Sequence, residues 1–402
     1  MALSMLNNQV DPASSPRRVS VLGSTGSVGC NTLDLIERRR GDFEIVALTA
    51  YRNVEKLVEQ AIRLRPGAVV IGDESKFEEL KTALSGTDVD VSAGAQALIE
   101  AAERPADWVM AAIVGAAGLG PTMTAVSRGA VVALANKECL VCAGPLMMDA
   151  VAANGATLLP VDSEHNAIFQ VFETERRDSI ERIILTASGG PFRTLDTAVM
   201  AHVTPAQAVA HPNWDMGAKI SVDSATMMNK GLELIEAHHL FDMPEDQIEI
   251  LIHPQSVVHS MVGYSDGSVL AQLGTPDMRT PIAYTLGWPA RVETPVARLD
   301  LAEIGQLTFE KPDETRFPAL RLARQALVSG GSAPTVLNAA NEIAVAGFLK
   351  DQIGFLDIAR VVEQTLESSE NASPRNLEDV ITIDTEARRI ASDSVRQLVG
   401  LA

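Results

Sequence analysis

Three short segments near the middle of the chain hold most of the residues that could act on a charged substrate. They are Val161–His165 (VDSEH), Thr186–Arg193 (TASGGPFR) and Asn229–Glu233 (NKGLE). Together they supply carboxylates, hydroxyl groups, an amide and a lysine. Carboxylate oxygens are the ligands that hard divalent cations prefer, while lysine and amide groups bind phosphate. The three segments therefore predict a metal site beside a site for a phosphorylated sugar.

The first segment places two carboxylates close together. Asp162 and Glu164 follow an apolar run at 156–160 that predicts a strand. If the chain stays extended there, both side chains point the same way. Two carboxylates about 4 Å apart repel by about 4 kcal/mol at an effective dielectric of about 20, so a cation, a proton or a basic neighbour must relieve them. His165 is the basic residue nearest in sequence, and a surface pair at a helix N-terminus is the alternative interpretation.

The third segment adds a further carboxylate. Asn229 and Glu233 are spaced i and i+4 on a predicted helix, so they share one face. We expect Glu233 to join the metal site and Asn229 and Lys230 to meet a phosphate. The alternative is that Lys230 and Glu233 form an ordinary surface ion pair.

The second segment ends a predicted strand with Ser188, Gly189 and Gly190. A serine hydroxyl and glycine N–H groups can form a nest for an anion. The glycines also provide a hinge for residues 188–218, which we expect to form a flexible flap. Trp214 in this flap suits a lid that excludes water, or alternatively fills a gap in the core.

A glycine-rich turn lies far upstream, at Gly23–Gly29 (GSTGSVG), between a predicted strand and a predicted helix. Glycines permit a tight turn and a close approach of the backbone to a pyrophosphate, and the helix N-terminus supplies free N–H donors. The segment therefore predicts a dinucleotide site. The alternative is a turn that only packs the helix on the strand.

The end of the next predicted strand bears on which dinucleotide binds. An NAD site usually has a carboxylate there for the ribose 2′-hydroxyl. The residues Thr49–Asn53 (TAYRN) contain no carboxylate, and Arg52 could pair with a 2′-phosphate, so the sequence favours NADP(H) over NAD. The alternative is that Arg52 is a solvated loop arginine. Ala135–Glu138 (ANKE) also follows a strand at its carboxyl end, where ligands gather in such sheets. An ordinary helix start capped by Asn136 is the alternative there.

The arrangement of apolar segments predicts an α/β protein. Strand and helix patterns alternate from 19 to 160, which indicates βαβ units and a mainly parallel, Rossmann-like sheet. A mixed α+β pattern follows, with Asp266 and Gly267 as a hairpin turn, and the last part is helical. We expect the following division: a disordered tail at 1–17, an NADPH-binding domain at 18–160, a catalytic and metal-binding domain at 161–287, a linker at 288–317 and a C-terminal α-helical domain at 318–402.

Composition excludes several classes of function. The chain has 402 residues, a net charge of −19 and an aromatic share of 4%, so a nucleic-acid binder is not expected. It lacks an apolar run long enough to span a membrane. Its three cysteines do not suggest a disulfide framework, and Cys139 and Cys142 lack a second pair for a zinc site. A cytoplasmic enzyme is expected.

Several motifs resemble the 1-deoxy-D-xylulose 5-phosphate reductoisomerase family of the non-mevalonate isoprenoid pathway, from about residue 18 to near the C-terminus. The matching segments are Leu22–Asn31 (LGSTGSVGCN), Leu134–Glu138 (LANKE), Leu159–Asn166 (LPVDSEHN), Leu185–Arg193, His211–Glu233 (HPNWDMGAKISVDSATMMNKGLE), Ile252–Val262 (IHPQSVVHSMV) and Asn338–Glu342 (NAANE). Tyr51 and Ala187 depart from the family pattern, where some members have glycine.

The resemblance implies roles for individual residues. Asp162, Glu164 and Glu233 would ligate a divalent cation, Mg²⁺ or Mn²⁺ with Co²⁺ also compatible. Lys137, Glu164 and His211 would be catalytic. The substrate would meet Ser163, Glu164, Ser188, His211, Trp214, Ser224, Asn229, Lys230 and Glu233. NADPH would meet Thr25, Gly26, Ser27, Val28, Tyr51, Arg52, Asn53, Asn136, Glu138, Met216 and Gly217.

The resemblance further implies a homodimer, formed through the 161–287 domain, and a reaction. 1-Deoxy-D-xylulose 5-phosphate would be isomerised and then reduced to 2-C-methyl-D-erythritol 4-phosphate, with NADPH and a divalent cation. Two other functions stay open on the residues alone. An NADP-dependent dehydrogenase of the semialdehyde or homoserine type would need no metal. A non-catalytic NADP-sensing protein would bind the cofactor without turnover, and would leave the carboxylate cluster unexplained.

Overall fold

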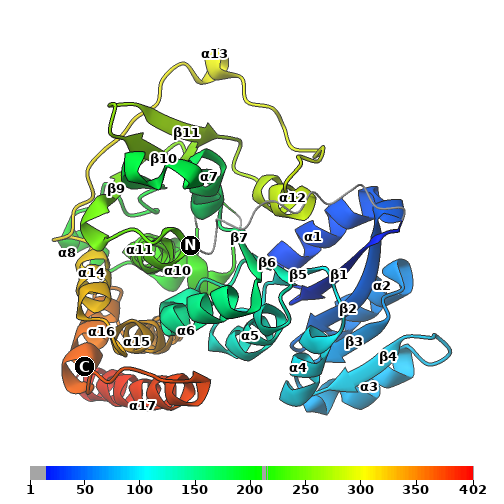
Figure 1. Cartoon of the computed structure of the whole chain (residues 1–402). Coiled ribbons are helices and arrows are strands. Elements are labelled where there is room, and N and C mark those ends of the chain that lie inside the picture. Colours follow the sequence, from blue (N-terminus) through cyan, green and yellow to red (C-terminus); the bar gives the residue numbers. More distant parts are fainter. Residues whose placement is uncertain (1–14, 211–213, 215, 402) are drawn as a thin grey trace. The chain divides into compact units, whose positions relative to one another are not determined.

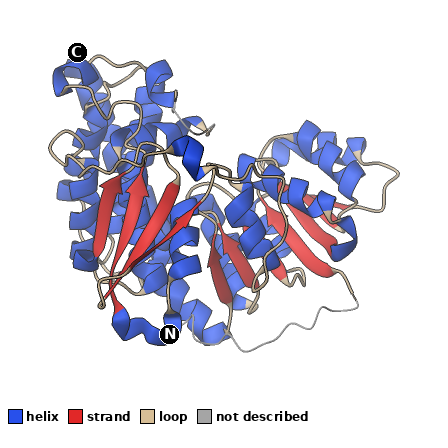
Figure 2. Ribbon diagram, turned by 90° about the horizontal axis from the view of Figure 1, so that it is seen from above, coloured by secondary structure: helices blue, strands red, loops and turns tan. Residues whose placement is uncertain are grey.

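The computed structural model describes residues 15–210, 214 and 216–401. These residues divide into two compact units. Unit 1 contains residues 15–139, 147–166 and 277–297, and unit 2 contains the described parts of 140–146, 167–276 and 298–401. Figure 1 labels the elements of both units, and Figure 2 shows their strands in red.

Unit 1 is built on a parallel sheet of seven strands in the order β4-β3-β2-β1-β5-β6-β7. The strands are β1 (Arg17–Leu22), β2 (Phe43–Ala50), β3 (Ala68–Ile71), β4 (Asp90–Ala93), β5 (Trp108–Ala111), β6 (Val131–Leu134) and β7 (Thr157–Pro160). The helices are α1 (Ser27–Arg38), α2 (Val54–Leu64), α3 (Phe77–Ala83), α4 (Ala95–Glu103), α5 (Leu119–Ser127) and α12 (Arg279–Gly287). The predicted Rossmann-like α/β fold is confirmed.

Alternation of side chains explains why this sheet is covered on both faces. In β3, Val69 and Ile71 enter one core cluster, together with residues of α1, α2 and α12. Ala68 and Val70 enter a second cluster with Ala97 and Ala101 of α4. Successive residues of a strand point to opposite faces, so both faces of the sheet must be apolar and buried.

Two helices, α6 and α7, each contain residues of both units. Helix α6 (Glu138–Asn154) contains residues of both units, and Ala143 inside it has non-helical dihedral angles. Helix α7 (Ser163–Val171) begins within unit 1.

Unit 2 contains a mixed sheet of four strands in the order β11-β10-β8-β9. Its strands are β8 (Ile180–Ala187), β9 (Ile248–Ile252), β10 (Val258–Tyr264) and β11 (Val269–Leu273). The helices are α8 (Thr197–Met200), α9 (Pro205–Val209), α10 (Ala218–Thr226), α11 (Met228–Phe241), α13 (Leu301–Ile304), α14 (Ala319–Ser329), α15 (Ala333–Leu349), α16 (Asp357–Ser368) and α17 (Leu377–Leu401). The predicted hairpin is present, because β10 and β11 pair antiparallel and Gly267 in their turn has φ +86°.

The observed units differ from the division predicted from the sequence, most of all at α12 and in the C-terminal part. Helix α12, placed by that division in the 161–287 region, packs against α1, and the indole of Trp108 donates to the carbonyl of Thr285 at 3.1 Å. The helices of the C-terminal part belong to the same unit as β8 to β11. Both differences arise because distant segments of the chain complete each core, which local patterns do not reveal.

None of the described helices combines the length and the apolar character needed to cross a membrane. All three cysteines carry free thiols.

Candidate active site

Two glycines of the turn between β1 and α1 have no space for a side chain. Gly23 has φ +89°, and a Cβ there would lie 2.4 Å from the carbonyl oxygen of Ala112. A Cβ on Gly29 would lie 2.4 Å from the carbonyl oxygen of Gly23. These two glycines therefore allow the tight packing of strand, turn and helix that the sequence predicts.

The N-terminus of α1 is suited to bind an anion. The helix begins at Ser27, and Gly26 at the N-cap has no side chain to accept from the first-turn N–H groups. A Cβ on Gly26 would have only the Gly23 carbonyl oxygen nearby, at 3.5 Å, so this part of the turn is open. Thr25, Gly26, Ser27 and Val28 thus lie where uncapped N–H groups and the helix dipole favour a pyrophosphate.

Tyr51, Arg52 and Asn53 follow β2 and are exposed. Nε of Arg52 lies 2.7 Å from Oδ2 of Asp73, and the guanidinium stacks 4.9 Å from the centre of the Tyr51 ring. Hydrogen bonds from Ser75, followed by the Arg52 guanidinium, lower the pKa of Asp73. The Arg52 side chain is still 65% exposed, so it can turn toward a ligand phosphate.

Asp73 was not among the residues predicted from the sequence, because it follows β3 rather than β2. Adjacent parallel strands end at the same edge of a sheet. The adjacency of β2 and β3 could therefore have suggested that Arg52 and Asp73 lie close together. Asn53 has a second role, because its Oδ1 accepts from the N–H of Lys56 at 3.1 Å and caps α2.

Asn136, Lys137 and Glu138 lie at the carboxyl end of β6 and are buried. The Asn136 amide donates to the carbonyl of Gly115 at 2.9 Å and to that of Ile113. The alternative in which Asn136 caps the helix is therefore wrong, and Lys137 occupies the N-cap of α6. The Lys137 side chain is directed to Asp162, with which it forms an ion pair.

The structure corrects the expected geometry of Asp162 and Glu164. Strand β7 ends at Pro160 and α7 begins at Ser163, so the two carboxylates do not lie on an extended segment. The carbonyl of Asp162 instead accepts from the N–H of Asn166 at 2.8 Å, as at a helix N-terminus. The Ser163 hydroxyl donates to Oε2 of Glu164 at 2.7 Å.

Asp162 has two basic neighbours, of which sequence proximity suggested one. Lys137 forms an ion pair with this carboxylate, and a ring nitrogen of His165, the residue to which the sequence pointed, lies within 4.8 Å of a carboxylate oxygen. The two strands that precede Lys137 and Asp162, β6 and β7, are adjacent and parallel, so both residues end at the same edge of the sheet. Tertiary structure thus places a lysine where a carboxylate needs a cation.

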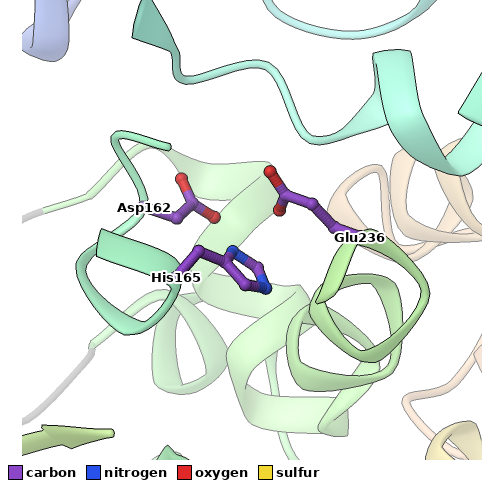
Figure 3. Close-up of side chains that lie close together, drawn as sticks. All are labelled: Asp162, His165 and Glu236. Carbon is purple, nitrogen blue, oxygen red and sulfur yellow. The ribbon is translucent and has the colours of Figure 1, made fainter. Parts of the chain in front are cut away.

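Two more buried ionisable residues lie on α7 and α11, and the sequence pointed to the first, His165, but not to the second, Glu236. His165 lies in the first turn of α7 and Glu236 lies in α11, with exposed fractions of 0% and 1%. Figure 3 shows both of them with Asp162. Buried ionisable groups need partners or a metal. Glu236 follows Glu233 by one helical turn, a spacing that could have drawn attention to it.

Ser188 and Ser224 belong to segments that pack together in unit 2. Gly189 and Gly190 have φ +83° and +68°, and the N–H of Gly190 donates to the Ser188 hydroxyl at 3.2 Å. A Cβ on Gly190 would lie 2.6 Å from the carbonyl oxygen of Ser224. The turn after β8 therefore lies directly against α10, as a shared phosphate site requires.

Asn229, Lys230 and Glu233 form a hydrogen-bonded group on α11. The Asn229 amide and the Lys230 ammonium both donate to the Glu233 carboxylate. The predicted i, i+4 relation is confirmed. The Lys230 and Glu233 side chains are 4% and 2% exposed, so the alternative of a surface ion pair is wrong. Burial of an ion pair removes two charges from water, which costs free energy. The burial of Lys230 and Glu233 therefore suggests a role other than stabilisation of the helix.

The expected flap at 188–218 contains the short helices α8 and α9. Thr204 and Gln207 form a capping box at the start of α9. Trp214 is half-buried, and its ring centre lies 6.4 Å from that of His259. Met216 precedes Gly217, which is the N-cap of α10. His211 lies outside the described residues.

Three family models match the chain. The model described as 1-deoxy-D-xylulose 5-phosphate reductoisomerase matches residues 19–144. Its C-terminal domain model matches residues 158–241, and the DXP reductoisomerase C-terminal domain model matches residues 273–390.

Known proteins are similar over nearly the whole chain. The 1-deoxy-D-xylulose 5-phosphate reductoisomerase of Rhodospirillum centenum is 65% identical over 379 residues, which cover 94% of each chain. That of Zymomonas mobilis is 61% identical over 375 residues, 93% of this chain and 97% of its own.

Two solved structures show the same fold. The Zymomonas mobilis enzyme in complex with NADPH has a TM-score of 0.91 at 59% identity, covering 95% of this chain and 100% of its own. A DOX-P reductoisomerase in complex with NADPH, fosmidomycin and magnesium has a TM-score of 0.90 at 43% identity, covering 95% and 99%.

Proposed function

Because the chain belongs to the 1-deoxy-D-xylulose 5-phosphate reductoisomerase family, we propose that the residues described above carry out the reaction of that family. The protein is an NADPH-dependent and divalent-metal-dependent oxidoreductase. It isomerises 1-deoxy-D-xylulose 5-phosphate and reduces the product to 2-C-methyl-D-erythritol 4-phosphate. The 65% identity over 94% of the chain carries this conclusion. A semialdehyde or homoserine-type dehydrogenase is not favoured.

NADPH fits the turn between β1 and α1. The uncapped N-terminus of α1 can hold the pyrophosphate, and Gly26 leaves room for its approach. Arg52, paired with Asp73, would contact the 2′-phosphate, and Tyr51 and Asn53 would border the adenosine. Asn136, Glu138, Met216 and Gly217 complete the proposed contacts. When bound, NADPH supplies the hydride of the reduction.

A hard divalent cation fits the carboxylates. Asp162, Glu164 and Glu233 offer only oxygen atoms, which suits Mg²⁺ or Mn²⁺ and also accommodates Co²⁺. Such a cation acts as a Lewis acid toward substrate oxygens and orients them. In the structure, two of these carboxylates form ion pairs with lysines: Asp162 with Lys137, and Glu233 with Lys230. These lysines balance the negative charge that the site must carry.

The phosphate would be bound in unit 2. We assign this role to Ser188, Ser224, Asn229 and Lys230, because the turn after β8 packs on α10 and Lys230 is buried on α11. Hydroxyl and amide groups would donate to the phosphate oxygens and the ammonium would balance their charge. Binding energy from this remote group can position the reacting carbons, so it should raise kcat as well as lower KM.

The sugar would contact Ser163, Glu164, Lys137, His211 and Trp214. Lys137 can donate a proton or a hydrogen bond from Nζ to a substrate oxygen, because its ammonium is already held at Asp162. Trp214 would cover the substrate and exclude water. The role of His211 rests on the resemblance alone.

We also propose a cytoplasmic homodimer. The family resemblance implies the dimer, and β11, an edge strand, exposes 47% of Val269 and 42% of Leu270. Sedimentation equilibrium of the purified protein would test it. The three free cysteines suit a reducing compartment.

The decisive experiment is NADPH oxidation by the purified protein with 1-deoxy-D-xylulose 5-phosphate, with and without Mg²⁺ or Mn²⁺. A loss of NADPH absorbance that occurs only when the metal is present would support the reductoisomerase assignment. Tight NADPH binding without turnover would contradict it and favour an NADP-sensing protein.

A further inference from the structure

A buried polar contact in unit 2 joins α10 to α15. Nδ2 of Asn341 donates to Oδ1 of Asp223 at 2.8 Å, although the residues are 118 positions apart. Their exposed fractions are 0% and 1%. Asn341 belongs to the NAANE segment, which carries part of the family resemblance without a role in the site described above. A buried carboxylate needs hydrogen bonds and a positive partner, so this contact needs a third residue.

Lys219 supplies that partner from one turn earlier on α10. Its Nζ lies 2.8 Å from Oδ2 of Asp223. Each carboxylate oxygen is therefore engaged, one by an ammonium and the other by an amide. The orientation of the Asn341 amide follows from this arrangement, because a flipped amide would direct its oxygen at the carboxylate.

The position of Asp223 on α10 connects this contact to the proposed phosphate site. The next residue is Ser224, whose carbonyl oxygen packs against Gly190 in the turn that also contains Ser188. Neighbouring residues of a helix project about 100° apart, so fixing one side chain fixes the direction of the next. A rotation of α10 by about 20° would move the tip of a side chain by about 2 Å, more than a hydrogen bond tolerates.

We propose that Asp223, held by Lys219 and Asn341, is a positioning residue that sets Ser224 for phosphate binding. The proposal rests on the function proposed above. Lys219 has a second effect, since it neutralises a carboxylate adjacent in sequence to a phosphate-binding residue. An unpaired negative charge there would repel the phosphate dianion. Asp223 thus acts through Ser224 and through charge balance, without contacting the substrate.

The test uses a charge cycle in the full-length protein: Lys219→Met, Asp223→Asn and the double variant. Kinetics are measured with 1-deoxy-D-xylulose 5-phosphate and NADPH in the presence of Mg²⁺. Lys219→Met leaves the carboxylate unbalanced and should raise KM for the sugar phosphate about tenfold, while KM for NADPH stays within about twofold. The double variant removes both charges and should recover most of that loss. Equal KM values for the sugar phosphate in Lys219→Met and the wild type would overturn the proposal.

A second variant tests the contact with α15. Asn341→Leu keeps the volume of the side chain and removes the donor, so KM for the sugar phosphate should rise about fivefold or more. Thr365→Ala is the matched control, because it removes a buried hydroxyl that bonds the Val361 carbonyl at 2.7 Å in α16 of the same unit.

The outcomes separate positioning from simple stability. If Asn341→Leu and Thr365→Ala lower the thermal midpoint alike but neither raises KM, the role of Asn341 is only structural and the proposal fails. If Asn341→Leu does not fold, Lys219→Met, at a side chain 26% exposed, decides the question. Failure of the wild-type protein itself to turn over the sugar phosphate would overturn the proposed function and this inference with it.

Discussion

The two units supply binding groups of different kinds. In unit 1 the proposed cofactor contacts come mostly from the backbone and from loops at the carboxyl ends of parallel strands. In unit 2 the proposed phosphate and metal contacts include charged side chains buried on α11. Glycine geometry thus forms the nucleotide turn of unit 1, whereas α11 of unit 2 carries charges that would be costly without partners.

Two ion pairs illustrate the difference. Arg52 and Asp73 in unit 1 lie near the surface, and such pairs contribute about 0–1 kcal/mol. Lys230 and Glu233 in unit 2 are almost fully buried, where removal of one partner costs about 3–5 kcal/mol. We therefore expect the loss of a charge on α11 to have a large effect in unit 2. In the glycine turn of unit 1, we expect an added methyl group to have a large effect.

The largest effect is expected from Glu233→Gln. This change removes a carboxylate from the proposed metal site and the partner of buried Lys230. Turnover should fall about 10²- to 10³-fold while NADPH affinity changes little. Steady-state kinetics and NADPH fluorescence titration measure the two quantities. Glu249→Gln, at an exposed ion pair of β9, is the control. Equal losses in turnover and NADPH affinity would argue against a metal role.

Gly29→Ala should destabilise the nucleotide turn. Its Cβ would meet the Gly23 carbonyl oxygen at 2.4 Å, so the free energy of unfolding should fall by about 1–3 kcal/mol. Urea denaturation checks this value. Gly41→Ala, which has no atom within 4 Å of its Cβ, should leave it unchanged.

Gly26→Ala separates cofactor binding from packing in the same turn. The nearest atom to its Cβ is 3.5 Å away, so stability should change little. If the pyrophosphate approaches the backbone there, NADPH should bind about tenfold more weakly. Isothermal titration calorimetry would decide, and unchanged affinity would place the pyrophosphate elsewhere.

A pH-dependent effect is expected in unit 2. Burial, and secondarily His238, lower the pKa of His239 from 6.5 to about 4. The unfolded chain therefore takes up this proton more readily than the folded protein. The contribution of neutral His239 to the free energy of unfolding is complete above about pH 6.5 and is lost as the pH falls toward 4. The loss amounts to about 3 kcal/mol.

Urea denaturation at pH 7 and pH 4.5 would measure this loss. His239→Gln should lose less stability between the two pH values than the wild type, whereas His202→Gln, at an exposed site, should behave like the wild type. The same acid sensitivity in all three proteins would assign the effect to other groups.

The smallest effect on the fold is expected from Arg52→Gln. Its ion pair is exposed, so the thermal midpoint should not change measurably. The preference for NADPH over NADH should fall about 10- to 100-fold, because a hydrogen bond to a charged group contributes about 1.5–3 kcal/mol. Comparison of kcat/KM for the two cofactors measures it. An unchanged ratio would mean that Arg52 does not meet the 2′-phosphate.

The periodic patterns of the sequence predicted much of the local structure. The glycine turn, the first strands and helices and the hairpin at Gly267 lie where the residues indicated. The ends of elements were less predictable. Asp162 and Glu164 were expected on an extended segment, but α7 begins at Ser163, between them. The predicted helical tail is present, and α17 forms its last part.

What the sequence alone determined were the chemical types and the local spacings. Asn229, Lys230 and Glu233 share a face because the helical repeat requires it, and Gly23 and Gly29 permit a turn that other residues would block. These relations involve neighbours along the chain, so a pattern can encode them.

Tertiary structure alone decided the partners. Lys137 balances Asp162 because β6 and β7 end side by side, Asp73 meets Arg52 across the sheet edge, and Asn341 reaches Asp223 from a distant helix. Burial of Lys230 and Glu233 likewise depends on helices that pack on α11 from the C-terminal part of the chain, including α14. Contacts of this kind depend on which surfaces the folded chain brings together, and no local pattern specifies them.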